Sequence, residues 1–489
     1  MRHPPEALTK VSLLLLTQCA FGVQVDEFVH ARMSSSGAAD VMLHLPAPLE
    51  LDSLQLDHMS RSRQRELVHQ HLVKQAEQKQ RAVRATLSRV GASFTPFWIA
   101  NRIAVRSLTA AVLEVLLSVH PHEIEFIMPI GGRSRHTPVS MLEGSFPLPT
   151  SHTDEPQWNI KLVSATKAWN LANGSGVVVA TLDGGVSYTH EALVDGYRGN
   201  MGGGAFSHDY NWKDWAYKRS APEDDDGHGT NVQGIATATH GFGVAPGSKW
   251  FTGKIFNFAG YSADDWTLAG CQFVMCPTPT HDSSPENCTL GADVVSNSWG
   301  EDTATSSFLK PVIAAWIKAG MVPVFAVGNA GPQCGTSVAP SDYAGVLAVG
   351  ATNKGDDICG FSSRGPAANS SKGPLPFSPL APSIVAPGLG IAGPSYTGRG
   401  SKGFSGTSQA APHVAGAAAV LLSFCPHLSP AEVATALYDH AATSTLQKPD
   451  TGKDECAGAG WPTFPNYIYG HGRLDVYAAL QSVRSSGAC

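Results

Sequence analysis

The sequence has no excess of basic residues, since 34 Lys and Arg stand against 40 Asp and Glu for a formal charge of −6. Proteins that bind nucleic acid through its phosphates carry a basic surface. The sequence therefore predicts no nucleic-acid partner. A membrane-spanning helix needs ~20 apolar residues. The apolar stretch 410–424 is shorter, contains Pro412 and His413, and is expected to be a buried helix, so no membrane span is predicted.

The N-terminus is typical of an exported protein. Arg2 and Lys10 precede the apolar run 11–16, and the small residues Ala20 and Gly22 follow it. A basic flank, a short apolar segment and small residues, in this order, indicate a secretory signal peptide. Residues 1–22 are predicted to be that signal. The protein is expected outside the cell or in a secretory or endolysosomal lumen.

The cysteines favour the same compartment. No two of the nine have the CxxC spacing of a zinc site. Eight lie beyond the signal, and an even number in an exported chain favours disulfides. Cys276 and Cys288 are an expected pair because they share one loop rich in Pro, Thr and Ser. The protein is also predicted to be a glycoprotein, because three Asn-X-Ser/Thr sequences occur, at Asn173, Asn287 and Asn369.

Glycine and proline are abundant, with 50 Gly and 33 Pro in 489 residues. This composition indicates many strand ends, turns and loops rather than a helical bundle. The chain is predicted to divide near residue 150. The stretch 131–156 is rich in Gly, Pro, Ser and Thr and contains Arg133 and Arg135. It is interpreted as a cleavable linker, with an ordinary interdomain loop as the alternative.

Residues 40–130 are predicted to form a small unit with the order β-α-β-β-α-β, which is that of a ferredoxin-like α+β fold. The predicted strands are 41–45, 94–99, 103–105 and 124–127, and the predicted helices are 61–89 and 108–118. No pattern of catalytic groups is present in this unit.

Beyond residue 157 short apolar runs alternate with helical stretches. The runs 177–182, 294–296, 322–327 and 346–349 are apolar on both faces, as strands of a parallel sheet covered by helices must be. The sequence therefore predicts an α/β domain. Because ligands of such sheets bind beyond the carboxyl ends of the strands, the residues that follow these runs are the functional candidates.

Two candidates are an aspartate and a histidine flanked by glycine. Asp183 ends the first run and precedes two glycines, so its carboxylate projects from a strand end. His228 stands between Gly227 and Gly229, just before the predicted helix 232–239. Glycine on both sides suggests close approach by another group. Taken singly, an aspartate at a strand end is usually a turn or cap residue, and the alternative for the histidine is an ordinary helix-start residue.

The segment around Ser408 predicts a nucleophile at the start of a helix. Pro412 has no amide hydrogen and is tolerated in a first helical turn, so the helix is predicted to begin near Thr407 or Ser408. The unpaired amides there favour an oxyanion. A serine needs a base. His413 points about 140° away around the helix and is predicted to be a packed core residue. His228 is therefore the predicted base.

A side-chain amide at another strand end would complete an oxyanion site. Asn329 follows the predicted strand 322–327, and Gly328 and Gly331 give the backbone freedom to aim the amide. The alternative is an ordinary turn.

These side chains, in chain order, resemble the catalytic residues of the subtilisin family of serine peptidases: Asp183, His228, Asn329 and Ser408. The order Asp, His, Ser distinguishes this family from chymotrypsin-like enzymes and α/β-hydrolases. Further matching segments are 243–247, 293–300, 361–366 and 385–388. The resemblance covers most of residues 157–480. Within the family, the chain is most similar to the bacillopeptidase F group.

The resemblance implies a fold and an activity. Residues 151–489 would form a subtilisin-like, doubly wound parallel sheet with helices on both faces. They would act as a secreted serine endopeptidase that cuts polypeptides through an acyl-enzyme. Residues 23–150 would be a prodomain and linker, with the prodomain as an intramolecular inhibitor of a self-processed zymogen. No cofactor is implied. Family members often bind structural calcium, but the acidic cluster 223–226 is interpreted as a solvated loop and no metal ligand is named.

The family resemblance also suggests where substrate lies. An extended peptide would add to the backbone at 257–261 and 298–300. The residues expected to line the first specificity pocket are Ser298, Trp299, Gly300 and Ala330.

Three departures from the family pattern leave an alternative open. Gly184 stands where the family has a hydroxyl residue, so one hydrogen bond to Asp183 is expected to be missing. Asn231 and Gln409 also differ from the common residues without removing a catalytic group. The alternative is a catalytically silent, subtilisin-like binding scaffold.

Overall fold

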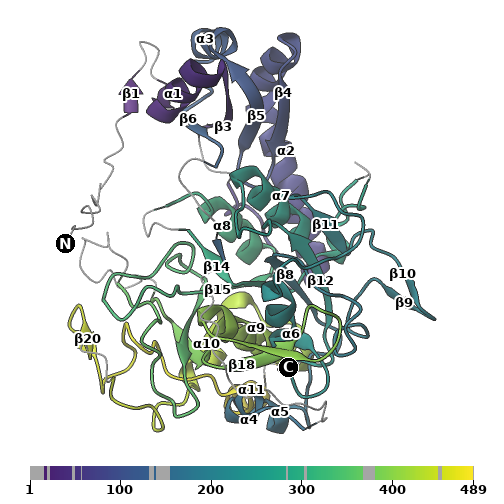
Figure 1. The fold of residues 1–489 in the computed structure, drawn as a ribbon, viewed down its shortest axis with the longest axis vertical. Helices are drawn as coiled ribbons and strands as arrows, with labels where there is room; N and C mark the ends of the chain where they lie inside the picture. The colour runs from purple at the N-terminus through teal and green to yellow at the C-terminus, as the bar shows by residue number, and fades with distance from the viewer. Residues whose placement is uncertain are drawn as a thin grey trace, which may run out of the picture. The chain divides into compact units, whose positions relative to one another are not determined.

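The structure is a computed structural model of the 489-residue chain. It describes residues 16–18, 23–46, 50–56, 58–131, 137–138, 155–281, 285–301, 306–366, 380–449, 454–487 and 489. Its contacts divide the chain into two units: unit 1 comprises residues 1–49 and 72–133, and unit 2 comprises residues 50–71 and 134–489. Helix α2 (Arg61–Arg89) therefore begins in unit 2 and ends in unit 1 (Figure 1). The predicted boundary at residue 150 stays a prediction.

Unit 1 is built on a sheet with the strand order β1-β2-β6-β3-β5-β4. The strands are β1 (Leu16–Gln18), β2 (Gln24–Asp26), β3 (Ala38–His44), β4 (Ser93–Phe97), β5 (Arg102–Thr109) and β6 (Phe126–Pro129). Two more helices are α1 (Glu27–Ser36) and α3 (Ala110–Val119). Each neighbouring pair in the order β6-β3-β5-β4 is antiparallel, which confirms the ferredoxin-like prediction. The sequence analysis did not predict β1, β2 and α1.

Alternating apolar residues give unit 1 its own core. Val41 and Leu43 of β3 pack with Ile103 of β5 and with Val83 and Leu87 of α2, all fully buried. Residues two apart on a strand and four apart on a helix share one face, so both patterns turn toward the same layer.

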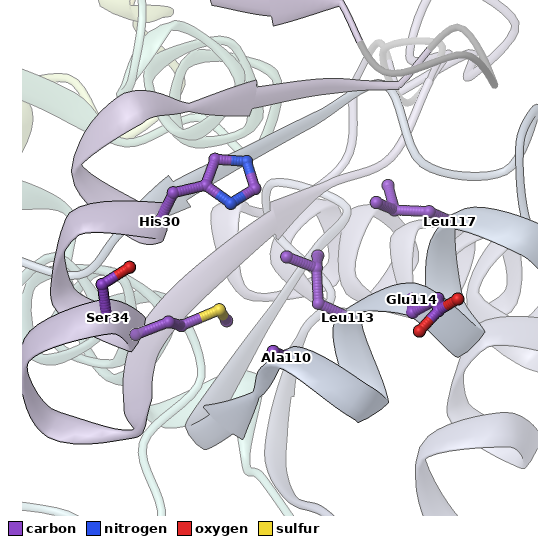
Figure 2. A pocket seen from close by; sticks show the side chains of 7 residues that line it. His30, Ser34, Ala110, Leu113, Glu114 and Leu117 are labelled. Carbon is purple, nitrogen blue, oxygen red and sulfur yellow. The ribbon is translucent and has the colours of Figure 1, made fainter.

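A hollow of about 410 Å³ lies between α1 and α3 of unit 1. Figure 2 shows His30 and Ser34 of one helix across from Leu113 of the other. The remaining lining residues are Met33, Ala110, Glu114 and Leu117. None of the predicted site residues contributes to this hollow.

Unit 2 contains a seven-stranded sheet in the order β11-β12-β8-β13-β15-β16-β17, with every neighbouring pair parallel. The strands are β8 (Val178–Asp183), β11 (Trp212–Asp214), β12 (Lys249–Lys254), β13 (Val294–Asn297), β15 (Val322–Ala326), β16 (Leu347–Thr352) and β17 (Ile384–Pro387). This confirms the predicted parallel sheet. The four predicted strands are β8, β13, β15 and β16.

Helices accompany this sheet, and α9 is the most deeply buried. The helices are α4 (Trp158–Leu162), α5 (Ala165–Ala168), α6 (His228–Thr237), α7 (Asp264–Met275), α8 (Lys310–Lys318), α9 (Thr407–Phe424), α10 (Pro430–Asp439) and α11 (Val476–Ser485). Residues 407–422 of α9 are all buried, and the helix packs on β13, β15, β16 and α6. Within the described ranges, no helix is both long and apolar enough to cross a membrane.

Short strand pairs complete unit 2. They are β7 (Thr137–Pro138) with β14 (Trp299–Gly300), β9 (Asn200–Gly202) with β10 (Ala205–Phe206), β18 (Ile391–Pro394) with β19 (Ser401–Phe404), and β20 (Glu455–Cys456) with β21 (Ala459–Gly460). All four pairs are antiparallel.

Three disulfides lie among the described residues of unit 2: Cys276–Cys288, Cys334–Cys456 and Cys425–Cys489. The first is the predicted pair. The even number of cysteines favoured disulfides over free thiols, but Cys271 and Cys359 are free and buried. Burial raises the pKa of both thiols, to about 12 for Cys359, so they behave as small apolar core residues. Cys19 and Asn369 lie outside the described residues.

Acid should destabilise unit 1 because it contains buried neutral histidines. Burial, reinforced by the nearby Arg102 cation, lowers the pKa of His44 well below the usual 6.5. Below about pH 6.5, His44 therefore binds a proton in the unfolded chain but stays neutral in the folded unit. Protonation then favours the unfolded state, so the free energy of unfolding falls as the pH falls below that value. We expect hydrogen exchange of unit 1 amides, corrected for the intrinsic rate, to accelerate from pH 7.5 to 5, and His44→Phe to reduce the effect. The same pH dependence in His44→Phe would contradict this account.

Candidate active site

The predicted site residues come from the carboxyl-terminal edge of the parallel sheet. Asp183 is the last residue of β8, and Asn329 follows β15 by three residues. His228 and Ser408 lie in the first turns of α6 and α9, two helices that pack against each other in Figure 1. Parallel strands bring their carboxyl ends to one edge, and helices return from that edge. The fold thus brings Asp183 into contact with His228, 45 positions later, and Asn329 into contact with Thr407, the residue before Ser408.

Asp183 and His228 form a buried pair. Asp183 Oδ1 lies 2.8 Å from His228 Nδ1 and also accepts the Gly184 amide at 2.7 Å. The two side chains are 1% and 0% exposed. Asp183 Oδ2 and His228 Nε2 are buried and make no hydrogen bond with any described residue. Among the described residues, the imidazole is therefore held through Nδ1 alone.

Glycine is required where α6 meets β8. A Cβ added to Gly229 would lie 2.1 Å from the Gly185 oxygen and 3.2 Å from Asp183 Cβ. Gly227, the residue before the helix, has φ 92°, which favours glycine. The close approach expected from the flanking glycines is therefore that of the aspartate strand itself.

Three carboxylates surround the His228 imidazole. Burial lowers its pKa, but Asp183, followed by Asp226 and Asp224, outweighs burial and raises the pKa above the usual value. Asp226 Oδ1 also accepts the His228 amide at 2.9 Å. This environment favours the imidazolium, the form that a general base must reach during proton transfer.

The interpretation of the acidic segment 223–226 as a solvated loop holds for Glu223, which is exposed, but not for Asp224, which is buried. Asp224 is 7% exposed and accepts the amides of Gly227 and Thr230 at 3.0 and 2.8 Å. Burial and the nearby Asp226 raise the pKa of Asp224 to about 6. The sequence analysis missed this residue, although its place four residues before a histidine flanked by glycine is a usable signal.

The next residue of that segment is also internally paired. Asp225 Oδ2 lies 2.7 Å from Lys254 Nζ, and Asp225 Oδ1 lies 2.7 Å from Arg219 Nη1. Lys254 is fully buried at the end of β12 and also donates to the Gly184 carbonyl. The buried Lys254 thus joins the acidic segment to the residue that follows Asp183. The sequence analysis did not predict this role, because a lysine is usually expected at the surface.

Ser408 lies in the first turn of α9, as predicted, but the argument from Pro412 needs correction. The helix begins at Thr407, so Pro412 is inside the helix rather than in its first turn. It cannot supply the amide that would bond the Ser408 carbonyl four residues earlier. Ser298 Oγ donates to that carbonyl instead, at 2.8 Å. Ser408 Oγ in turn donates to the Ser298 carbonyl at 3.1 Å.

Asn329 is oriented by the residue next to Ser408. Its Oδ1 accepts both the amide and the hydroxyl of Thr407 at 2.9 Å. The amide nitrogen therefore faces the other way, and a Cβ added to Gly406 would lie 3.1 Å from it. This places a hydrogen-bond donor beside the loop that precedes Ser408.

Two of the three residues that depart from the family pattern contact each other. Gln409 Nε2 donates to Asn231 Oδ1 at 3.2 Å. They follow Ser408 and His228 by one and three residues, so this bond links the starts of α9 and α6. His413, as expected, is a core residue: its ring bonds the Gln409 carbonyl and the Asn159 amide, each at 2.8 Å, and burial lowers its pKa to about 4.

The predicted pocket residues have unequal roles. The Trp299 indole is fully buried and donates to the Leu182 carbonyl at 2.8 Å, so its side chain belongs to the core and only its backbone can meet a ligand. A Cβ added to Gly300 would lie 2.5 Å from Val338. Ala330 is exposed. The backbone of Trp299 and Gly300 pairs with β7.

Metal binding has little support among the described residues. The one group with suitable spacing there is His69, Cys276 and Cys288. Both of these cysteines are joined in a disulfide, so they offer no thiolate.

A family comparison agrees with this geometry. The model of the subtilase family, peptidase family S8, matches residues 174–472. The chain belongs to this family. Bacillopeptidase F of Bacillus subtilis (strain 168) is 31% identical over 405 residues, which are 79% of this chain and 26% of that protein. Thermitase of Thermoactinomyces vulgaris is 28% identical over 66% of this chain and 96% of its own length.

The solved structures show the same fold for this subtilase. Fervidolysin from Fervidobacterium pennivorans, described as a keratinolytic enzyme related to subtilisin, aligns with a TM-score of 0.60 at 18% identity. The alignment covers 91% of this chain and 61% of fervidolysin. The predicted family, and the likeness to bacillopeptidase F within it, are confirmed.

Neutralising Asp226 should lower the pKa of His228. Asp226→Asn keeps the oxygen that accepts the His228 amide but removes a negative charge that stabilises the imidazolium. We expect the His228 ring in this subtilase to titrate at lower pH, as followed by NMR. Glu223→Gln is the matched control, because it makes the same charge change at an exposed side chain that pairs with Arg219. Equal shifts in both variants would contradict a specific role of Asp226.

Ser298 and Pro412 should be energetically coupled. Ser298→Ala leaves the buried Ser408 carbonyl without its donor, which costs about 1–3 kcal/mol in the free energy of unfolding. In a Pro412→Ala background the new amide can bond the same carbonyl, so the loss of Ser298 should cost less. A double-mutant cycle by denaturant unfolding, with Ser408→Ala throughout to prevent proteolysis, measures the coupling. An equal cost in both backgrounds would contradict it.

Proposed function

We propose that the protein is a secreted serine endopeptidase, made as a zymogen that cuts itself. Its catalytic residues are Asp183, His228 and Ser408, with Asn329 in the oxyanion site. The observation that carries the proposal is the buried contact of 2.8 Å between Asp183 and His228 at the sheet edge where α9 begins. Its membership of the subtilase family supports the same chemistry.

The reaction follows from the roles of these groups. Ser408 Oγ attacks the carbonyl carbon of the scissile bond while His228 Nε2 accepts the hydroxyl proton. Asp183 holds the Nδ1 proton and stabilises the imidazolium. The bond to the leaving nitrogen breaks as His228 returns the proton to it, which leaves an acyl-Ser408. Water, activated by His228, then releases the acid.

Negative charge on the carbonyl oxygen needs two donors. The Ser408 amide lies in the first turn of α9, where backbone N–H groups lack partners within the helix. The Asn329 amide nitrogen faces the same loop, because its oxygen is held by Thr407. Both donors are fixed before the charge develops, which is the condition for effective stabilisation.

Backbone pairing at β14 supports an extended substrate. Trp299 and Gly300 pair antiparallel with Pro138 and Thr137, which lie in the linker interpreted as cleavable. Ser298, the residue just before this strand, contacts Ser408. The protein's own linker therefore occupies the edge where we place polypeptide substrates, and we propose that self-cleavage occurs in the linker after Pro138.

The rest of the proposal concerns processing and export. Residues 1–22 act as the signal peptide, and residues 23–150 as the inhibitory prodomain and linker. Three disulfides agree with an oxidising compartment. Glycosylation is proposed at Asn173 and Asn287. The chemistry needs no cofactor.

Ser408→Ala should abolish activity. In subtilisin itself, removal of the catalytic serine lowers turnover by about 10⁶, and we expect an effect of that order on hydrolysis of a chromogenic peptide, together with loss of self-cleavage in the linker. Ser405→Ala is the control: it loses a hydrogen bond to the Gly390 amide but no nucleophile. Unchanged hydrolysis in Ser408→Ala would overturn the assignment of Ser408 as the nucleophile, whereas a wild-type chain without activity would favour the silent scaffold.

A further inference from the structure

A segment from the N-terminal part of the chain is anchored in unit 2. Residues 50–71 were expected to belong to the prodomain, yet their contacts place them with the catalytic residues. They include the first turns of α2, which carry Arg61, Arg65 and His69. The partners of these side chains lie on a surface that we call the anchor surface: Glu286, Cys288, Ala292, Asp293 and Pro426.

Arg65 makes the most buried of these contacts, with its side chain 4% exposed. It donates to the carbonyls of Cys288 and Ala292 at 3.0 and 3.1 Å and to Asp293 Oδ1 at 3.2 Å. A guanidinium donates its hydrogen bonds in a rigid planar geometry. The three acceptors around the buried Arg65 side chain therefore form a binding site that is specific for arginine.

Arg61 shares the same carboxylate. It donates to Asp293 Oδ1 at 2.9 Å and to the Pro426 carbonyl at 2.7 Å. The other oxygen, Oδ2, accepts the Val178 amide at the start of β8. Despite burial, the cations Arg65 and Arg61 lower the pKa of Asp293. One carboxylate therefore joins the helix to the catalytic sheet.

The anchor surface and the residues beside it complement the start of α2 in shape as well as in charge. A Cβ added to Gly291 would lie 2.7 Å from Arg65 Cδ, and one added to Gly320 would lie 2.3 Å from Gln64 Oε1. His69 Nε2 lies 2.7 Å from Glu286 Oε2. The Cys276–Cys288 disulfide ties the loop that carries these acceptors to the end of α7.

This surface lies away from the active site. Asp293 precedes β13, whereas Ser298, which contacts Ser408, follows it. The two sites are thus at opposite ends of the same strand. Binding at the anchor surface does not require the active site to be filled.

We propose that the anchor surface is a docking site for residues 50–71 of the chain's own N-terminal part and keeps that part bound after the linker is cut. The inference rests on the proposed self-cleavage. It adds a second attachment, independent of the β7–β14 pairing. When the segment leaves, Asp293 and Glu286 are exposed as an acidic surface that fits a helix with arginines four residues apart.

The first test follows the two fragments after self-cleavage. The full chain is allowed to cut itself, is then inactivated with a fluorophosphonate, and is analysed by size-exclusion chromatography. We expect the N-terminal fragment to co-elute with the catalytic fragment in the wild type. In Arg61→Ala/Arg65→Ala its dissociation should be at least about tenfold faster, because truncating a buried charge pair acts on the off-rate.

Arg63→Ala is the matched control. Arg63 lies between the two anchor arginines but is 53% exposed and pairs with Glu66 of the same helix. We expect it to behave as the wild type. Arg65→Lys keeps the charge without the fork, so it should give an intermediate rate. Equal retention in the double alanine variant, or separation of the fragments in the wild type, would overturn the proposal.

The second test does not depend on cleavage. In the uncut Ser408→Ala chain, Arg65→Ala should accelerate hydrogen exchange in residues 61–71 and 288–293, and Arg63→Ala should not. Unchanged protection in Arg65→Ala would overturn the anchor. If the anchor variants behave as expected here but the wild-type chain never cuts itself, the proposed self-processing fails and the docking contact stands.

Discussion

The contact between Asp183 and His228 is the constraint on which the rest of the site depends. A buried carboxylate is costly unless hydrogen-bonded, and here Oδ1 is held by the imidazole and by the Gly184 amide. The fold meets this demand by ending β8 at the aspartate and starting α6 at the histidine, with Gly229 at the point of closest approach. Asp224 then fixes the loop that carries the histidine.

The start of α9, which carries Ser408, depends on a hydrogen bond from Ser298. Pro412 has no amide hydrogen to donate to the Ser408 carbonyl within α9. The hydroxyl of Ser298, the residue after β13, donates to this carbonyl instead. This hydrogen bond ties the strand edge that pairs with β7 directly to the proposed nucleophile. A substrate strand added at that edge would therefore be positioned by the same residue that supports Ser408. Asn329, held by Thr407, completes this half of the site.

Much of the fold could be predicted from the sequence, because apolar periodicity and glycine-flanked polar residues report local structure. The helix 61–89, the four central strands and the start of α9 were all accessible in this way. The long-range contacts of individual side chains were harder to predict. The burial of Asp224 and Lys254 depends on long-range contacts that charge alone does not reveal. The short strands β11 and β17 carry too few residues for a pattern. The free thiols Cys271 and Cys359 show that cysteine parity does not determine pairing.

The anchor surface was hidden from the sequence for the same reason. In the sequence, Arg61 and Arg65 are simply part of a charged helix, and only the fold brings Asp293 to them from 232 and 228 residues away. Two segments of unit 2 that come from the N-terminal part of the chain, the start of α2 and β7, thus contact residues on either side of β13.

The most direct test of the central claim is the rate at which a fluorophosphonate modifies the protein, with the modified residue mapped by mass spectrometry. The account predicts a single adduct, on Ser408, that forms far more slowly when Asp183→Asn removes the charge behind the imidazole. An adduct on another residue, or equal rates in the two proteins, would contradict it.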